Sequence, residues 1–488
     1  MIEAKQASRM VPRPEHGVVA ATALLVVLIV VVGRVSTPVF LILAAGTLAL
    51  AAVCAHLWPR ATLVGATLMT LADPVITPQL LPGALALGPI GASEPLLAVA
   101  GVVIAYDAWR RGTFVPALRD PVFWLALVWV LVAAVSALVN STPPLVATLG
   151  IVMTVDAIAI YFVWRMVPST SSQAFSAVSV IVLAVSVAAL VGIGQLWFDS
   201  SLEGYRRITS FLGNPNMLAL VIGLALPFPL YGSRHLERRR LRWAAGILAF
   251  TLLLALVLTF SRGAWISVVL GMLLGTLILD RRTFLPLLLA SVLAFGAAVA
   301  LPRSAPADDG AAKPPPDVIS TVLSRFGQLT GGDDTRLRWV ADGLRIIEDH
   351  PWFGVGPGRY GGAAATIIPS PVYAEYGTSL GGHRTVHNFW LHLMGEVGVF
   401  GFAVFLTMLV GLTIRCIRAA KRATGTVFVL LAGTATMMLV VGINDLTEML
   451  FEGNVPGLLV WLILGIASTL APTSPPEGVQ AATDGPAA

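Results

Sequence analysis

Charged side chains are scarce in this chain. Of its 488 residues, 57% are hydrophobic and only 12% are charged, whereas a water-soluble domain carries about a quarter charged residues. The mean hydropathy of +0.85 excludes an ordinary soluble protein and indicates a membrane protein. The long apolar runs do not alternate with polar residues at every second position, so a membrane β-barrel is excluded as well.

Cysteine is nearly absent, and no other residues complete a metal site. Cys54 and Cys416 lie near the side that we expect to face the cytoplasm, so we expect neither a disulfide nor a metal site from them. His383 and His387 have a spacing that can bind zinc on a helix, but no cysteine and no carboxylate at a fitting offset accompanies them. We therefore expect no metal and no cofactor.

Two further features are missing: an internal repeat and a small-residue cleavage site after the first apolar segment. The first apolar segment, 18–33, is therefore predicted to be a transmembrane helix rather than a signal peptide. The absence of a repeat also argues against many transporter folds, which are often built from paired repeats with broken helices.

Long apolar runs are what the chain has in abundance. A helix needs roughly 20 mostly apolar residues to cross a bilayer, so we predict an all-α integral membrane protein with about 12–14 transmembrane helices. Asp73, Pro74 and Pro78 interrupt the third candidate span. The candidate spans are 18–33, 38–57, 61–80, 93–108, 121–139, 145–166, 174–197, 215–231, 242–260, 263–279, 284–301, 387–413, 424–442 and 453–470.

The positive-inside rule predicts the orientation. With both termini in the cytoplasm, nineteen Lys and Arg residues lie inside, and the short outer connections hold only Arg34, Arg206, Arg207 and Arg262. We expect a multi-pass protein of the plasma membrane. Its predicted parts are a cytoplasmic segment (1–16), eleven transmembrane helices (17–301), an outer loop (302–386), three more transmembrane helices (387–471) and a disordered cytoplasmic tail (472–488).

The outer loop contains one predicted helix. Residues 302–317 are rich in Pro, Ala, Asp and Gly and are typical of a flexible connector. Residues 334–349 have the pattern of an amphipathic helix with Asp334 as its N-cap. Such a helix can lie on the membrane surface or pack over a cavity. Its predicted apolar face consists of Leu337, Val340, Ala341, Leu344 and Ile347.

His387 is the strongest candidate for proton transfer. It follows the polar loop and is succeeded directly by an apolar helix, and imidazole is the side chain best suited to proton transfer near neutral pH. A histidine at a helix start can also be purely structural. Glu396 lies nine residues on, roughly on the opposite helix face, so it is a poor partner for His387, although it could pair with a neighbouring arginine. Asn388 could orient the loop or a sugar.

Arginines close to predicted helix starts are candidates for binding phosphate. Arg206 and Arg207 precede Asn214-Pro215-Asn216, and Arg262 lies in a tight connection between two apolar helices. Arginine can hold a phosphate through two parallel hydrogen bonds. The alternative is that these arginines contact lipid head groups or snorkel to the membrane surface. Asn214 and Pro215 can also be a plain helix start, with Asn214 as the cap.

Weaker candidates lie in the loops. Arg359 is in the segment Gly356–Gly361, which formally matches a dinucleotide-binding motif, but no strand precedes it, so we reject a nucleotide site. Its glycines could present backbone N–H groups to an anion. Arg384 lies beside the two histidines. Three acidic residues in the last outer connection are interpreted as solvated charges rather than as a cation or sugar site: Asp445, Glu448 and Glu452.

Four segments stand out in this order: Ile208–Pro227 with its Gly-Asn-Pro-Asn core, Phe260–Trp265, Asp349–Gly358, and His387-Asn388 followed by nine residues and Gly398-x-x-Gly401. Together they resemble the O-antigen ligase and polymerase superfamily of polyprenyl-linked glycan transferases. The resemblance covers about residues 206–401, and the first 200 residues match only in hydrophobicity. The superfamily usually has about a dozen spans, fewer than the longest count above.

The resemblance implies a glycosyltransferase that moves a glycan from undecaprenyl diphosphate to an acceptor hydroxyl on the outer side of the plasma membrane. The acceptor would be a glycolipid or a wall polymer, and no nucleic acid is expected as a partner. We expect His387 to be the general base. Arginines would offset the charge of the diphosphate in place of a metal ion. The expected diphosphate ligands are Arg262, Arg206, Arg207, Arg359 and Arg384, with Asn388, Asn214 and Asn216 in support.

Two rival functions stay open at this point. A polymerase would join lipid-linked repeat units to one another, whereas a ligase moves a finished chain to a different acceptor, and the shared segments do not separate the two. A transporter or flippase of lipid-linked glycans would also suit many spans and central charges, but it has little need for a long outer loop that ends in a histidine helix.

Overall fold

The computed structural model describes helices at most of the predicted positions. It describes residues 37–73, 91, 93–198, 207–300, 335–362, 364, 368, 370, 372, 375–376, 386–449, 451 and 454–471. Within these ranges there is no strand, which confirms the all-α class. The predicted span 18–33, the connector 302–317 and the tail 472–488 lie outside the described residues.

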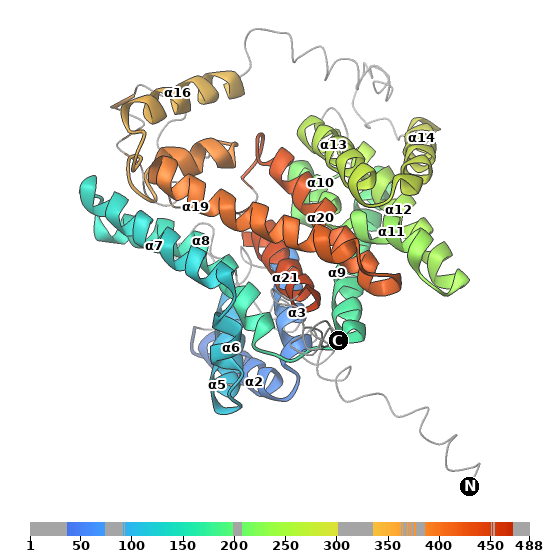
Figure 1. Ribbon diagram of the computed structural model, residues 1–488, viewed down its shortest axis with the longest axis horizontal. Helices are drawn as coiled ribbons and strands as arrows, with labels where there is room; N and C mark the ends of the chain where they lie inside the picture. Colours follow the sequence, from blue (N-terminus) through green and yellow to red (C-terminus); the bar gives the residue numbers. More distant parts are fainter. Residues whose placement is uncertain are drawn as a thin grey trace, which may run out of the picture.

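The described helices follow one another along the chain (Figure 1). Nine of those in the described ranges are long and apolar enough to cross a membrane. The chain is therefore a multi-pass membrane protein. In order, the elements are α2 (Thr37–Leu57), α3 (Pro59–Met69), η3 (Thr70–Ala72), α5 (Glu94–Arg110), α6 (Phe114–Leu118), α7 (Pro121–Val139), α8 (Pro144–Arg165), α9 (Ser171–Phe198), η5 (Ser210–Leu212), α10 (Pro215–Ala225), α11 (Pro227–His235), α12 (Arg239–Leu258), α13 (Arg262–Leu279), η6 (Arg281–Thr283), α14 (Phe284–Ala300), α16 (Thr335–Asp349), α19 (Phe389–Ala420), α20 (Gly425–Asn444) and α21 (Asn454–Leu470).

The spans differ in how deeply they are buried. In the span Pro215–His235, made of α10 and α11, 83% of the residues in the most apolar window are buried, and in α20 the share is 72%, against 22% in α7. Helix α20 packs against α10, α11, α13 and α19. These helices therefore form the centre of the bundle, and the residues at their ends are held by packing on several sides.

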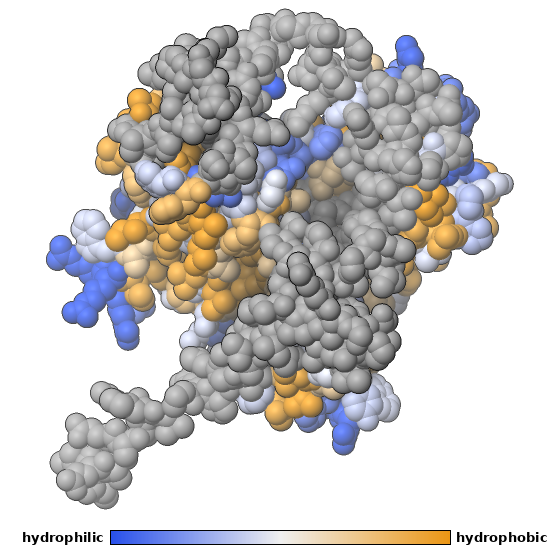
Figure 2. All heavy atoms as spheres, turned by 180° about the vertical axis from the view of Figure 1, so that it is seen from behind, coloured by the Kyte–Doolittle hydropathy of each residue, from blue (hydrophilic) through white to orange (hydrophobic). Residues whose placement is uncertain are grey.

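The surface of the bundle is largely apolar. Large side chains such as Leu138, Leu285 and Trp124 are 80%, 69% and 60% exposed. In the space-filling view of Figure 2, hydrophobic residues cover broad areas, and hydrophilic residues gather in separate groups at the margins. An apolar surface of this extent is typical of a protein whose helices contact lipid.

Two predicted spans are shaped differently from the prediction. The third, predicted at 61–80, is an α-helix from Pro59 to Met69 and continues as a 3-10 turn over Thr70–Ala72, and its predicted remainder 74–80 lies outside the described residues. The eighth, predicted at 215–231, continues to His235 and contains a break at Leu226, where Pro227 removes a backbone donor.

Helix α19 is longer than predicted and is kinked. It runs from Phe389 to Ala420, and Gly398 interrupts it with φ +66°, a left-handed conformation that favours glycine. The kink leaves two carbonyl groups open to the loop before α19. Val355 N donates to Gly395 O at 2.8 Å, and Gly356 N donates to Glu396 O at 3.0 Å. The kink therefore fastens the loop 351–358 to the bundle.

Helix α16 forms where it was predicted, but it buries another face. Its buried residues are Trp339, Gly343 and Ile346, while Leu344 is 48% exposed and Ala341 is exposed. The predicted apolar face is therefore wrong in part, because indole is amphipathic and was not counted as a core residue. The helix packs against α19. The predicted N-cap Asp334 and the side chain of Leu337 lie outside the description.

Candidate active site

His387 lies beside Glu448 at one end of the bundle. Its Nδ1 is 3.2 Å from Glu448 Oε2, and the two side chains are 37% and 13% exposed. An imidazole that donates from Nδ1 to a carboxylate carries its lone pair on Nε2. The pair can therefore hold the ring in the tautomer whose Nε2 accepts a proton.

The backbone around His387 is held from the same side. His387 has φ +52°, which is uncommon for a residue with a side chain. Asn388 is the N-cap of α19, accepts a hydrogen bond from Leu391 N and donates to Leu446 O at 3.0 Å. Phe389 N donates to the carbonyl groups of Asp445 and Glu448. The start of α19 is thus hydrogen-bonded to the turn 445–448 that carries Glu448.

Asn216 and Arg207 extend this pair into a chain of polar contacts. Asn216 Nδ2 donates to Glu448 Oε1 at 3.0 Å, and Arg207 Nη2 donates to Asn216 Oδ1 at 2.7 Å. Arg207 Nε donates to Thr259 O at 2.7 Å. Asn214 caps α10, as predicted, by accepting from Asn216 N and Met217 N. We call Arg207, Asn216, Glu448 and His387 the His387 network.

Arg262 lies close to the same turn. It is the first residue of α13 and is partly buried. A Cβ added to the next residue, Gly263, would lie 2.4 Å from Thr447 Oγ1. The first turn of α13 therefore packs directly on the residue that precedes Glu448, which brings a guanidinium-bearing position next to the network.

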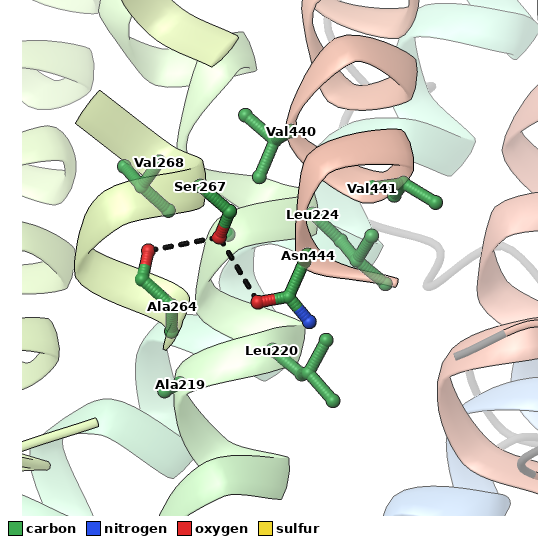
Figure 3. A pocket seen from close by; sticks show the side chains of 10 residues that line it. Ala219, Leu220, Leu224, Ala264, Ser267, Val268, Val440, Val441 and Asn444 are labelled. Atoms are coloured by element: carbon green, nitrogen blue, oxygen red, sulfur yellow. Dashed lines mark hydrogen bonds between the residues drawn. The ribbon is translucent and has the colours of Figure 1, made fainter. Parts of the chain in front are cut away.

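Directly before the turn 445–448, polar contacts connect α13 to the end of α20. The Ser267 hydroxyl lies 2.9 Å from Asn444 Oδ1, and the two side chains point toward one another in Figure 3. Asn444 O in turn accepts from Thr447 N and Glu448 N at 2.8 and 3.1 Å. Both Ser267 and Asn444 are buried. The position of Glu448 is therefore set by α13 as well as by α20.

The backbone N–H groups of the glycine-rich loop 356–361 bind a carboxylate of the protein itself, that of Glu396. Glu396, 4% exposed, accepts hydrogen bonds from Gly358 N and Tyr360 N, both at 2.8 Å. Its carboxylate also lies 3.8 Å from His392 Nδ1. The sequence left open a pair between Glu396 and a neighbouring arginine. The two backbone hydrogen bonds place this carboxylate in the scaffold under the loop.

The structure brings only some of the predicted residues together. His387, Arg207 and Asn216 are in one network, and Arg262 lies beside it. Asn214 caps α10, which carries Asn216, and Asn388 caps α19 directly after His387. Arg359 is elsewhere in the loop, where Nη1 lies 3.3 Å from the carbonyl oxygens of Asn140 and Val355. Arg206 and Arg384 lie outside the described residues.

The interpretation of the last outer connection is wrong for two of its three acidic residues. Asp445 is 0% exposed, and the Glu448 side chain is 13% exposed and hydrogen-bonded to two predicted site residues. Both were interpreted as solvated charges, because short connections usually lie in water. Glu452 lies outside the described residues. The signal in the sequence was that Asp445 lies within one helical turn of the end of the apolar run 424–442 and that Glu448 follows three residues later.

A second residue that the sequence analysis missed is Trp339. Its ring stacks on the His387 imidazole, with centroids 5.3 Å apart and planes 17° apart. In the part of the chain that the structure describes, no three His, Cys, Asp or Glu side chains are grouped closely enough to hold a metal ion.

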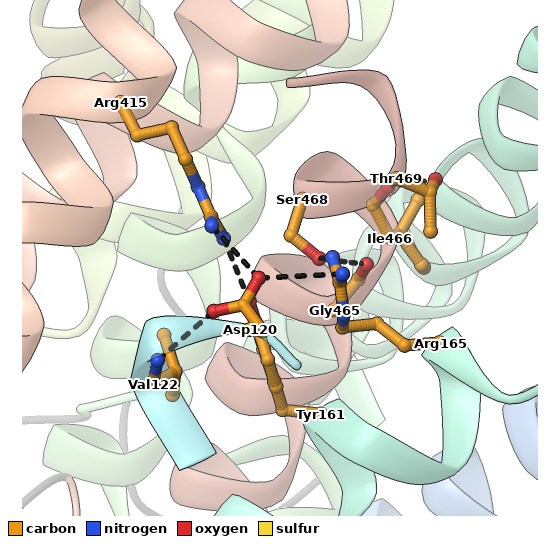
Figure 4. A network of polar contacts seen from close by, with 9 residues as sticks. All are labelled: Asp120, Val122, Tyr161, Arg165, Arg415, Gly465, Ile466, Ser468 and Thr469. Atoms are coloured by element: carbon orange, nitrogen blue, oxygen red, sulfur yellow. Dashed lines mark hydrogen bonds and ion pairs between the residues drawn. The ribbon is translucent and has the colours of Figure 1, made fainter. Parts of the chain in front are cut away.

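A second polar cluster lies where α7 begins and α19 ends, far along α19 from His387. Figure 4 shows its side chains. Asp120, whose side chain is 0% exposed, lies 2.8 Å from Arg415 Nη1 and 3.3 Å from Arg165 Nη2. Arg415 Nη2 donates to Tyr161 Oη at 2.6 Å, and Arg165 Nη1 donates to Ser468 Oγ at 2.9 Å. The Asp120 cluster therefore ties α7, α8, α19 and α21 together. The bundle has distinct ends, named here for His387 and Asp120.

These features define a multi-pass α-helical membrane protein with a histidine–carboxylate pair and arginines at one end. The family model described as O-antigen ligase matches residues 247–406, about a third of the chain. The match includes Arg262, α16 and His387, and it confirms the resemblance to the O-antigen ligase and polymerase superfamily. The match supports an O-antigen ligase- or polymerase-like membrane enzyme, and that family implies lipid-linked glycan and acceptor substrates. A search of curated proteins finds no match.

Proposed function

We propose that this protein transfers a glycan from undecaprenyl diphosphate to an acceptor hydroxyl, as an O-antigen ligase does, with inversion at the anomeric carbon and without a metal ion. The observation that supports this most is the His387 network, in which a base, a carboxylate and a guanidinium group are linked through three hydrogen bonds. Those are the groups that a hydroxyl nucleophile and a diphosphate leaving group require.

In this proposal His387 is the general base. Nδ1–H donates to Glu448, and Nε2 takes the proton of the acceptor hydroxyl as its oxygen attacks the anomeric carbon. The imidazolium that forms is stabilised by the Glu448 carboxylate, as in other histidine–carboxylate pairs. The new bond joins the acceptor oxygen to the anomeric carbon, and the bond to the diphosphate oxygen breaks.

The leaving diphosphate takes the electron pair and needs positive charge nearby. Arg207 and Arg262 are the described candidates, Arg206 and Arg384 are the predicted ones outside the described residues, and Arg359 is the weakest because its guanidinium contacts loop carbonyls. A guanidinium cannot be deprotonated at physiological pH and can bridge two phosphate oxygens. Asn216 would orient Arg207 toward the phosphate, and Asn388 would fix the His387 loop.

The orientation is part of the proposal. Nineteen Lys and Arg residues lie on the side of the Asp120 end when the predicted spans are alternated across the membrane. The positive-inside rule then assigns the Asp120 end and both termini to the cytoplasm and the His387 end to the outer face of the plasma membrane. There a lipid-linked donor is accessible without a nucleotide.

The test is glycan transfer by the purified protein from a lipid-diphosphate glycan to an acceptor. We expect His387→Ala to lower kcat by about 10²–10⁴-fold and Arg262→Ala to lower kcat/KM. The matched controls are His56→Ala, whose side chain is 56% exposed and lies toward the Asp120 end, and exposed Arg240→Ala. If the folded His387→Ala and Arg262→Ala variants turn over like the wild type, the assignment is wrong.

A deletion strain separates the ligase from the polymerase. Long glycans that accumulate on the carrier lipid indicate a ligase, and single repeat units still attached to the acceptor indicate a polymerase. Movement of lipid-linked glycan across proteoliposomes without a new glycosidic bond would contradict both and indicate a transporter.

A further inference from the structure

We propose that Trp339 is a positioning residue for the base: its indole lies against one face of the His387 imidazole and holds the ring in the plane in which Nε2 meets the acceptor hydroxyl. The inference rests on the proposed function, because it concerns the same histidine. It adds a residue of the loop helix α16 to a site otherwise built from the ends of the spans.

The contact is a parallel stack. The ring centroids are 5.3 Å apart and the planes differ by 17°, the offset arrangement that aromatic pairs favour. Trp339 is 9% exposed and belongs to a small apolar cluster on the loop. The cluster holds the indole in place and thereby gives the imidazole a fixed wall. The other buried members are Ile346, Val355, Tyr360, Val372 and Val386.

The imidazole needs such a wall because its hydrogen bond to Glu448 fixes one edge and not the plane. With 37% of the side chain exposed, a small turn of the ring about its Cβ–Cγ bond would tilt its plane and carry Nε2 away from the acceptor. The stack restricts that rotation. The hydrogen bond at the Nδ1 edge, the stack on the ring face and the backbone at φ +52° then constrain the imidazole together.

No hydrogen bond to a described residue holds the indole there. Trp339 Nε1 is buried and has no partner among the described residues, although buried indole N–H groups usually find one. The ring face and the packing of the cluster therefore determine where Trp339 lies. Trp339→Phe removes a donor that has no partner among the described residues, keeps an aromatic face and is therefore the conservative variant.

The first measurement is steady-state transfer by Trp339→Leu, Trp339→Met and Trp339→Phe. An aromatic pair contributes about 0.5–1.5 kcal/mol, so we expect the two aliphatic variants to lower kcat about 2–13-fold and to leave KM for the lipid-linked donor unchanged. Trp339→Phe should restore most of kcat. The matched control is Trp352→Leu, since Trp352 is 60% exposed and stacks on Phe400 instead of a histidine.

The second measurement does not depend on turnover. Diethyl pyrocarbonate modifies accessible imidazoles, and mass spectrometry of the His387 peptide gives the rate. We expect the rate to rise severalfold in Trp339→Leu and Trp339→Met and to stay at the wild-type value in Trp352→Leu. Size-exclusion profiles identify variants that fail to fold, and Trp339→Phe should behave as the wild type.

The outcomes are distinguishable. Unchanged kcat and unchanged modification in the folded aliphatic variants of an active enzyme would overturn the role of Trp339 and leave the proposed function intact. A higher KM with unchanged kcat would make Trp339 a substrate contact and would also overturn it. A wild-type protein that forms no product under any condition would overturn the proposed function and the positioning role together.

Discussion

At the scale of single residues, Glu448 has the most specific expected effect. Glu448→Gln keeps the size of the side chain and an oxygen that can accept from Asn216, but it removes the charge facing His387. A hydrogen bond to a charged group contributes about 1.5–3 kcal/mol. We therefore expect kcat for glycan transfer to fall about 10–100-fold with KM for the donor nearly unchanged.

The control for this change is Glu237→Gln, because Glu237 is exposed and lies in the connection between α11 and α12. It should transfer glycan at the wild-type rate. A Glu448→Gln variant with wild-type kcat would show that the carboxylate supports the fold around His387 and not the charge that develops on the imidazole.

At the scale of elements, the first turn of α13 sets the position of Glu448. Gly263→Ala would place a methyl group 2.4 Å from Thr447 Oγ1 and push the turn 445–448 away from α13. A shift of about 1 Å in a catalytic group can reduce the rate about 100-fold, so we expect kcat to drop by at least tenfold. Initial rates with saturating donor measure this.

Two variants test whether that loss comes from the clash. Gly246→Ala in α12 is the matched control, because its new methyl group would meet nothing closer than Ser233 Cβ at 4.0 Å. Adding Thr447→Ala to Gly263→Ala removes the obstructing hydroxyl and should recover activity. If the double variant stays as slow as Gly263→Ala, the clash with Thr447 is not the cause.

At the scale of the whole molecule, the Asp120 cluster holds the other end of the bundle together. Asp120→Asn leaves two largely buried guanidinium groups without their carboxylate. Breaking a buried pair by removing one partner typically costs about 3–5 kcal/mol. We expect the thermal unfolding midpoint in detergent, followed by size-exclusion chromatography of heated samples, to fall by several degrees.

The comparison for that change is Asp107→Asn. Asp107 pairs with His56 and Arg111, whose side chains are both 56% exposed, and ion pairs with such exposed partners contribute about 0–1 kcal/mol. The midpoint of this variant should stay close to that of the wild type. Equal midpoints for Asp120→Asn and Asp107→Asn would contradict a structural role for the Asp120 cluster.

The sequence by itself determined the membrane class, the positions of most helices and several members of the candidate site. Apolar length is a local property, which is why the range predicted at 121–139 coincides with α7. The cap and first residue of a helix are also local, so Asn214 and Pro215 could be identified directly. The place of His387, between a polar stretch and an apolar run, can likewise be recognised from its neighbours in the sequence.

Only the tertiary structure decided which groups surround His387. Glu448 lies 61 positions away along the chain, and Trp339 comes from a helix whose buried face could not be chosen from its own pattern. Likewise, the kink at Gly398 is used by loop residues that precede α19. Contacts of this kind depend on how helices pack and where their ends meet, because that packing brings together residues that are distant in sequence.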